Sequence, residues 1–375
     1  MKAWQILFLF LLSFSFLIPS LLREMPFGSD SQYFLNHACG KGVDNLETTP
    51  LLAKAFFESI PCEPLLWKTI PSFIIFFCAL FAGKMGELFH KEKGWMVGLF
   101  VFFSFAFIQQ AFQFEDDVLA YPILYASLFF YMKAKVGKEK LSGINYLFAF
   151  GLLGLAGLFW KGAIFYLLVY AFGNLLSFLG FLLANFLFKA NPITSVFINI
   201  NIGENVPFWG VLAHFIPLLI GFIYIPAIIM PETLIWLLFG FFTVKFSFHA
   251  VPFLAIGFLH LLEANKENKR LKNLLFLGSI VPLLSMVLIF GGFPQYDDLE
   301  MAQYVSKYSN GRTIINNWGL GYLIKFYGGN PANYGTYTVT SRQGLVVASE
   351  RDLIELDFNK CEEIRKIGKW SMLEC

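Results

Sequence analysis

Long apolar stretches separated by short charged clusters dominate this sequence and restrict what it can fold into. The first stretch runs from about Trp4 to Leu22, which is long enough to cross a bilayer. Of the 375 residues, 57% are hydrophobic and 14% are charged, whereas about a quarter of the residues of a soluble domain are charged. The sequence therefore predicts an all-α polytopic membrane protein and excludes a disordered chain, a collagen and a small disulfide scaffold.

Hydropathy predicts about eleven transmembrane helices. After the first, the apolar runs cover roughly 70–88, 95–112, 118–132, 144–159, 161–173, 175–188, 209–227, 231–244, 247–262 and 274–291. The stretch 161–188 has two interpretations, either two short helices that turn near Gly173 and Asn174 or one long helix. We keep two short helices because of the family resemblance described below, and they would also place Glu204 on the same side as the other acids.

Clusters of lysine and arginine predict the orientation. They follow the second, fourth and tenth spans, near residues 91–93, 133–140 and 266–272, and all fall on one side. The positive-inside rule makes that side cytoplasmic and places the amino terminus there. The first span has no cleavage site and is interpreted as an uncleaved anchor. Because the basic residues form short clusters rather than one face, the net charge of +2 does not indicate nucleic-acid binding.

Four segments are then expected outside, namely the loops 23–69, 113–117 and 189–208 and the tail 292–375. The tail is too polar to span the membrane. It contains a predicted strand at Thr313–Ile315 and a turn-rich stretch at 328–331. We expect a transmembrane domain over 1–291 and a small extracytoplasmic α/β domain over 292–375.

Four of the five cysteines lie in these external segments. Disulfides persist outside the cytoplasm, so Cys39 could pair with Cys62 and Cys361 with Cys375. The alternative is that they are free thiols. Cys78 lies within an apolar run and is expected to be a core residue.

Carboxylates gather in the external loops close to the membrane. Asp30 follows the first span, Glu115, Asp116 and Asp117 lie between the third and fourth spans, and Glu204 lies in a later loop. Carboxylates at a bilayer edge repel one another and lose hydration, and a divalent cation such as Mg²⁺ or Mn²⁺ relieves both effects. In an extended turn, Glu115 and Asp117 would face one site and Asp116 would face away.

Each of these residues also has an ordinary interpretation. An isolated acid such as Asp30 or Glu204 is most often simply solvated. The Glu-Asp-Asp run could cap the next helix, where negative charge stabilises the amino-terminal end by about 0.3–1 kcal/mol. Lys245 lies at a predicted external end, where it either meets an anionic phosphate or snorkels to the surface. Four histidines show no metal-ligand spacing and are expected to pack in the core or at the membrane interface: His37, His214, His249 and His260.

The order of these motifs resembles the catalytic subunit of oligosaccharyltransferase, most closely the single-subunit form of bacteria and archaea, among the C-type membrane glycosyltransferases. Asp30 in Ser-Asp-Ser-Gln-Tyr-Phe matches the family's first-loop Asp, and Glu115 and Asp117 match its Asp-x-Asp. The other matches are Phe159-Trp160-Lys161-Gly162 for an aromatic turn, Asn201-Ile202-Gly203-Glu204 for Thr-Ile-x-Glu, Lys245 to Pro252 for Arg-Phe-Thr-x-Tyr-x-x-Pro, and Asn317 to Tyr322 for Trp-Trp-Asp-Tyr-Gly-Tyr. The resemblance spans roughly residues 4 to 330.

The resemblance implies a C-type glycosyltransferase fold and a metal-dependent, inverting glycosyl transfer at the outer membrane face. The donor would be a sugar on a polyprenyl (pyro)phosphate. Asp30, Glu115, Asp117 and Glu204 would hold Mg²⁺ or Mn²⁺, and Lys245 would meet the donor phosphate. Asp30 and Glu204 would also act on the acceptor as catalytic residues. Trp318 would bind the acceptor.

The chain departs from the family where the acceptor is recognised. Asn317 and Gly319 replace a Trp and the Asp of Trp-Trp-Asp, the element that holds the hydroxyl of the Asn-x-Ser/Thr acceptor. Lys245 cannot form the two-pronged phosphate contact of Arg. The acceptor could therefore be a protein, a lipid or a glycan. A non-catalytic paralogue that binds lipid-linked sugar is a further alternative, and a transporter fits less well because the acids lie at the membrane edge rather than at its middle.

Overall fold

The structure is a computed structural model that describes residues 1–41, 50–137, 142–171, 232, 248–265, 267, 269–292, 294–332, 344–355, 358 and 360–375. The chain divides into two compact units. Unit 1 comprises residues 1–19, 49–53 and 70–288, and unit 2 comprises 20–48, 54–69 and 289–375. The loop between the first two spans thus contributes to unit 2 together with the tail.

Unit 1 is helical. Its described helices include α1 (Ala3–Ser15), α6 (Trp95–Val101), α7 (Phe105–Gln113), α8 (Asp116–Val136), α9 (Ser142–Phe159), η2 (Lys161–Ile164), α10 (Phe165–Ala171), η3 (Phe248–Ala250) and α16 (Val251–Ala264). Four more helices run between the ranges of the two units: α2 (Leu17–Leu21), α4 (Leu51–Ser59), α5 (Pro64–Glu87) and α17 (Lys269–Gly291).

Four described helical stretches are long and apolar enough to cross a membrane: Ala3–Leu21, Pro64–Phe89, Ser142–Phe159 and Leu275–Tyr308. Phe248–Ala264 is a shorter apolar helix. Large apolar side chains on all four of the long helices are exposed, for example Leu11, Phe73, Leu147 and Val287. Exposed apolar surface of this extent suits lipid as the solvent, so unit 1 has the character of a membrane domain.

The apolar run 95–112 forms two helices rather than the single helix expected from hydropathy. α6 ends at Val101, and α7 begins after Ser104, whose hydroxyl accepts a hydrogen bond from the backbone N–H of Phe107 at 3.3 Å. A serine at this position satisfies one amide of the new helix. The break redirects the chain inside the run, which hydropathy cannot reveal.

Ion pairs lie at the carboxyl ends of α8 and α16, which we call the far ends of these helices. Near the end of α8, Lys135 pairs with the buried carboxylate of Glu232. Near the end of α16, Glu263 contacts His90 at 2.7 Å and Lys93 at 3.3 Å. We call these two groups the far-end ion pairs.

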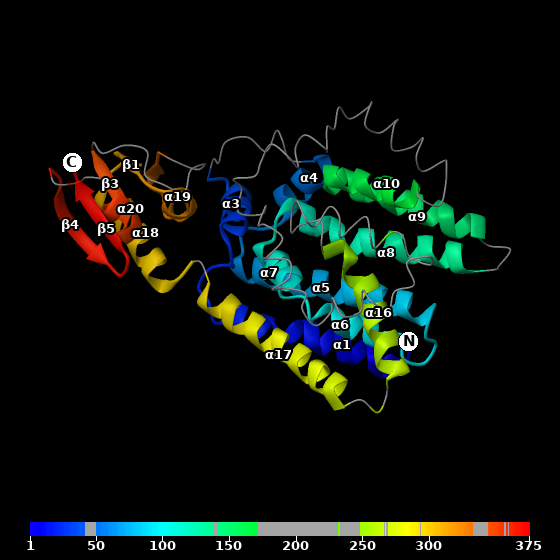
Figure 1. Cartoon of the computed structure of the whole chain (residues 1–375). Coiled ribbons are helices and arrows are strands. Elements are labelled where there is room, and N and C mark those ends of the chain that lie inside the picture. Colours follow the sequence, from blue (N-terminus) through cyan, green and yellow to red (C-terminus); the bar gives the residue numbers. More distant parts are fainter. Residues whose placement is uncertain are drawn as a thin grey trace. The chain divides into compact units, whose positions relative to one another are not determined.

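Unit 2 combines helices with a five-stranded sheet of order β2-β1-β3-β5-β4 (Figure 1). Its strands are β1 (Thr313–Ile315), β2 (Asn330–Pro331), β3 (Leu345–Ser349), β4 (Glu362–Ile367) and β5 (Trp370–Glu374), and its helices include α3 (Ser29–Ala38), α18 (Tyr296–Tyr308), α19 (Trp318–Phe326) and α20 (Glu350–Glu355). β1 pairs in parallel with β2 and β3, whereas β5 pairs antiparallel with β3 and β4. The predicted strand at Thr313–Ile315 is confirmed, and the tail contributes the strands of a small sheet.

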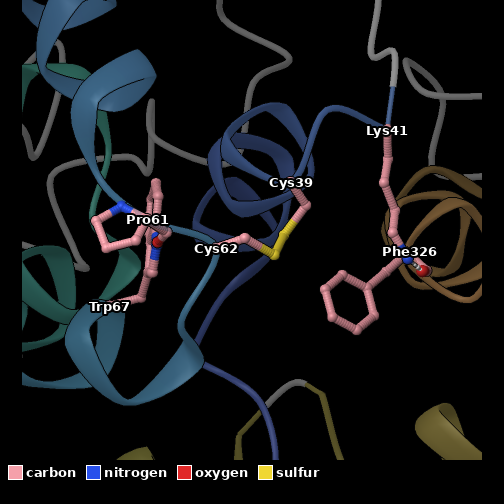
Figure 2. Close-up of a disulfide and its surroundings, with 6 residues drawn as sticks. All are labelled: Cys39, Lys41, Pro61, Cys62, Trp67 and Phe326. Atoms are coloured by element: carbon pink, nitrogen blue, oxygen red, sulfur yellow. Dashed lines mark hydrogen bonds between the residues drawn. A yellow bond between two sulfur atoms is a disulfide. The ribbon is translucent and has the colours of Figure 1, made fainter.

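Both predicted disulfides are present in unit 2, between Cys39 and Cys62 and between Cys361 and Cys375. Figure 2 shows the first of them next to Trp67, whose indole N–H donates to the carbonyl of Pro61 at 3.2 Å. The bond ties the end of α3 to the segment that leads into α5. Cys78 is buried and free, as expected.

A buried arginine, Arg23, caps the carboxyl end of α17 within unit 2. The Arg23 guanidinium donates to the carbonyls of Ile289 at 2.6 Å, Phe290 at 2.9 Å and Pro294. A cation is favourable at a helix carboxyl end. Burial lowers the pKa of Arg23 to about 10, an effect that the negative charge of Asp298 opposes. The side chain is therefore still charged at neutral pH.

Candidate active site

The predicted acids at residues 115–117 lie at a sharp turn between α7 and α8. Phe114 ends α7 in the left-handed conformation, with φ 51° and ψ 53°, and its side chain is fully buried. A bulky residue adopts this conformation only where its surroundings hold it there. Glu115 is extended, and α8 begins at Asp116. The expected extended turn therefore covers only Glu115, because Asp116 and Asp117 are already helical.

Glu115 and Asp117 are both buried, with exposed fractions of 7% and 0%. Glu115 occupies the capping position of α8 without a side-chain capping hydrogen bond, and Asp116 and Asp117 begin the helix. The run therefore also places negative charge where it stabilises the amino-terminal end of α8. Asp117 accepts a hydrogen bond from the hydroxyl of Tyr121 at 3.0 Å. Tyr121 lies four residues later, on the same face of α8. Two carboxylates are thus held inside the protein in the first turn of a helix.

Aromatic rings from three segments surround Tyr121. Its ring centroid lies 5.4 Å from that of His249 and 6.5 Å from that of Trp160. His249 stacks on Trp160 at 5.6 Å, and its Nδ1 lies 2.5 Å from the hydroxyl of Tyr166. Tyr121, Tyr166 and His249 are fully buried. We call Asp117, Tyr121, Trp160, Tyr166 and His249 the acid-aromatic cluster.

The acid-aromatic cluster brings three of the sequence motifs together within unit 1. The Glu-Asp-Asp run supplies Asp117, the aromatic turn after α9 supplies Trp160, and the motif that begins at Lys245 supplies His249. The hydroxyl of Tyr125 also donates to the carbonyl of Phe248, at 3.1 Å. Lys245 itself, like Glu204, lies outside the described residues.

A second pair of predicted site residues lies within unit 2. Asp30 is in the first turn of α3, which follows Gly28 with a positive φ of 85°, a conformation suited to glycine. Trp318 is the first residue of α19. The structure places both backbones but does not describe these two side chains.

Helices α3 and α19 pack against each other along their length. The side-chain amide of Asn36 donates to the carbonyl of Tyr322 at 2.7 Å, and Tyr33 and Tyr322 have ring centroids 5.5 Å apart. Further on, the ammonium of Lys41 meets the carbonyl and the ring of Phe326 (Figure 2). The contacts advance in the same direction along both helices. The first turns that carry Asp30 and Trp318 therefore lie at the same end of this pair.

The altered acceptor motif has a structural role in α19. Asn317 caps the helix, since its side-chain oxygen accepts a hydrogen bond from the backbone N–H of Leu320 at 3.2 Å. Asparagine is a preferred residue at this position. Its side chain therefore pairs with a backbone amide at the start of α19. Gly319 has no side chain that could bind an acceptor hydroxyl.

The buried acids fit a hard divalent cation by chemistry. Glu115 and Asp117 supply carboxylate oxygens from one helix start, and such oxygens are the ligands that Mg²⁺ and Mn²⁺ prefer. Within the described ranges, no group of three or more His, Cys, Asp or Glu side chains gathers in a way that could hold a metal ion. Within these ranges, Glu115 and Asp117 alone do not make a complete ligand set.

Sequence reasoning missed Tyr121 and gave His249 only a packing role. The burial of His249 confirms that role, but its hydrogen bond to Tyr166 and its contact with Tyr121 tie it to the acid. The spacing of Tyr121, four residues after Asp117 on a predicted helix, was a usable signal. His249 offered no comparable signal, because its neighbours come from distant parts of the chain.

No family model matches the sequence, and no curated protein matches it. Among solved structures, the fold is similar to the archaeal oligosaccharyltransferase AglB from Archaeoglobus fulgidus, in a complex with an inhibitory peptide and a dolichol-phosphate. The TM-score is 0.59 and the identity 12%, over 93% of this chain and 70% of that chain. The chain therefore has an oligosaccharyltransferase-like membrane fold.

Proposed function

We propose that this protein is a metal-dependent, inverting glycosyltransferase that takes its sugar from a polyprenyl (pyro)phosphate at the outer membrane face. The observation that carries the proposal is the acid-aromatic cluster, which joins a buried carboxylate to two other motifs of the resembled family in the same unit. The similarity in fold to AglB agrees with it. The dolichol-phosphate and peptide bound to AglB make a lipid-linked donor and a peptide acceptor reasonable partners.

The proposal gives each site residue a task. Asp30, Glu115, Asp117 and Glu204 hold Mg²⁺ or Mn²⁺. When bound, the cation neutralises the charge that develops on the leaving phosphate. Lys245 supplies a further positive charge to that phosphate. Asp30 and Glu204 also orient the acceptor, which approaches the anomeric carbon from the face opposite the departing phosphate.

The disulfides support the proposed orientation. Cys39–Cys62 and Cys361–Cys375 both belong to unit 2, and disulfides persist in oxidising compartments. We therefore assign the protein to the cell membrane as a multi-pass protein with a cytoplasmic amino terminus and an extracytoplasmic carboxyl terminus. The proposed topology has about eleven spans in a catalytic domain over 1–291, followed by the small domain 292–375.

The capping role of Asn317 favours a second candidate with the same chemistry and a different acceptor. Because Asn317 is engaged in α19 and Gly319 has no side chain, the hydroxyl of an Asn-x-Ser/Thr peptide loses its usual partner. A glycan or lipid acceptor does not need that contact. Trp318 would still provide an apolar surface for the acceptor.

One assay tests the proposal and separates the acceptors. Purified protein is incubated with a polyprenyl-pyrophosphate sugar, Mn²⁺ and a panel of an Asn-x-Thr peptide, a glycan and a polyprenyl phosphate. Transfer that is lost in Asp30→Ala, Glu204→Ala and Asp117→Asn, and retained in the neighbouring control Asp116→Asn, supports the proposal, and the product identifies the acceptor. Lipid-linked sugar binding without transfer or metal dependence would favour the non-catalytic paralogue.

A further inference from the structure

The carboxylate of Asp117 is held by a neutral hydroxyl whose ring is itself fixed from several sides. We propose that Tyr121 is a positioning residue for Asp117, and that His249, bonded to Tyr166, fixes Tyr121 so that Asp117 is ready to bind a divalent cation. This inference rests on the proposed function, because it assumes that Asp117 is a metal ligand.

The first step of the argument concerns the carboxylate. Asp117 is fully buried, and its Oδ2 accepts from the Tyr121 hydroxyl at 3.0 Å. A hydrogen bond to one carboxylate oxygen fixes the plane of the group and the direction of the other oxygen. Groups that hold a metal-binding carboxylate in this way affect metal affinity almost as strongly as the ligands do, typically by about 10- to 100-fold.

The second step concerns the ring of Tyr121. Four rings lie around it, at centroid distances of 5.4 to 6.5 Å, and they come from α7, from the turn after α9 and from η3: Phe107, Trp160, Phe248 and His249. A side chain enclosed in this way has few alternative rotamers. The hydroxyl therefore stays directed at Asp117 without a further loss of side-chain entropy when a cation binds.

The third step concerns His249, the nearest of these rings. It lies nearly perpendicular to Tyr121, at 84°, and stacks on Trp160 at an angle of 24°. Its Nδ1 is 2.5 Å from the Tyr166 hydroxyl, so its rotation about the side-chain bonds is restricted. His249 belongs to η3, which directly precedes α16. The start of α16 is thereby linked mechanically to the acid at the start of α8.

Other buried tyrosines of unit 1 direct their hydroxyls at partners other than Asp117. Tyr125, one turn later on α8, donates to the backbone carbonyl of Phe248. Tyr170 pairs with the hydroxyl of Ser127 at 2.9 Å. Both rings are buried. Tyr170→Phe is the matched control for the loss of a buried hydroxyl, because the Tyr125 hydroxyl bonds the segment that carries His249.

The test measures Mn²⁺ binding directly, by electron paramagnetic resonance of free Mn²⁺ in a titration of detergent-purified full-length protein without donor. We expect Tyr121→Phe to weaken binding by about tenfold or more, and the control Tyr170→Phe to leave it unchanged. His249→Ala should weaken binding to a similar extent. In the double variant, the second substitution should add little, because both act through one contact.

The outcomes distinguish this inference from the proposed function. If the unsubstituted protein binds Mn²⁺ and Tyr121→Phe binds it equally well, the positioning role is wrong while the metal site stands. Additive losses in the double variant would remove His249 from the role. If the unsubstituted protein binds no Mn²⁺, the metal-dependent function fails, and this inference fails with it. Since Tyr121→Phe preserves the ring, an unchanged thermal unfolding midpoint confirms that the comparison is between folded proteins.

Discussion

The two ends of α8 and α16 hold their carboxylates in different ways. At the far ends, Glu232 and Glu263 pair with cationic or basic groups of the protein, Lys135 for the first and Lys93 and His90 for the second. At the near end, Asp117 accepts a hydrogen bond from a neutral tyrosine enclosed by rings. The far-end ion pairs offset charge within the protein, whereas the tyrosine hydroxyl orients the carboxylate of Asp117. We propose that the far-end acids are structural and that Asp117 is functional.

The largest expected effect tests this contrast at Asp117. Asp117→Asn keeps the size of the side chain but removes its charge. We expect transfer to fall by roughly 10²–10³-fold, as on removal of one group that stabilises the transition state. The thermal unfolding midpoint should not fall. The matched substitution at the far end, Glu263→Gln, should preserve transfer per folded molecule, and a similar loss of transfer in both variants would contradict the contrast.

Breaking the far-end pair Lys135–Glu232 should instead lower the free energy of unfolding. Glu232 is fully buried, so Lys135→Met leaves an uncompensated charge inside unit 1. We expect a loss of about 3 kcal/mol in the free energy of unfolding, measured by thermal or denaturant unfolding in detergent. Lys133→Met, on the same turn, is the control because it leaves the pair intact. Reduced transfer per folded molecule in Lys135→Met would show that this end also serves the reaction.

Features that depend on neighbouring residues could be predicted from the sequence, whereas features that depend on residues far apart in the chain could not. The position of Glu115 and Asp117 next to a helix start follows from their place between two apolar runs, but their burial does not. The strand at Thr313–Ile315 and the two disulfides were also predictable, because composition and cysteine placement indicate them locally. The break at Ser104 was not, since both of its sides are apolar.

Contacts between distant segments could not be derived from patterns along the chain. The Arg23 guanidinium meets carbonyls some 266 positions away, and His249 meets Tyr166 across 83 positions. An arginine that follows a membrane span, or a histidine within an apolar stretch, does not reveal which distant residue it contacts. The number of spans, the ligand role of Asp30 and Glu204 and the phosphate role of Lys245 remain predictions.

The Cys39–Cys62 disulfide, one of two in unit 2, extends the contrast from charge to compartment. Cys39→Ser with Cys62→Ser should lower the free energy of unfolding by about 2–4 kcal/mol, because the bond restricts the unfolded chain. A reductant should destabilise the unsubstituted protein by at least as much. Cys78→Ala, which removes the buried free thiol in unit 1, is the control and should keep the full response to reductant. A protein that is insensitive to reductant would argue against an oxidising location for unit 2.

The substitution that should change stability least, at Lys93, tests which side of the membrane the far-end ion pairs face. The Lys93–Glu263 pair is partly exposed, with 47% of the lysine side chain accessible, so Lys93→Cys should cost no more than about 1 kcal/mol. The new thiol lies among the far-end ion pairs, which the positive-inside rule places in the cytoplasm. In intact cells, a membrane-impermeant maleimide should therefore leave it unlabelled until the membrane is opened. Labelling without opening would reverse the orientation, and Asp117 would then lie on the side opposite to the proposed donor.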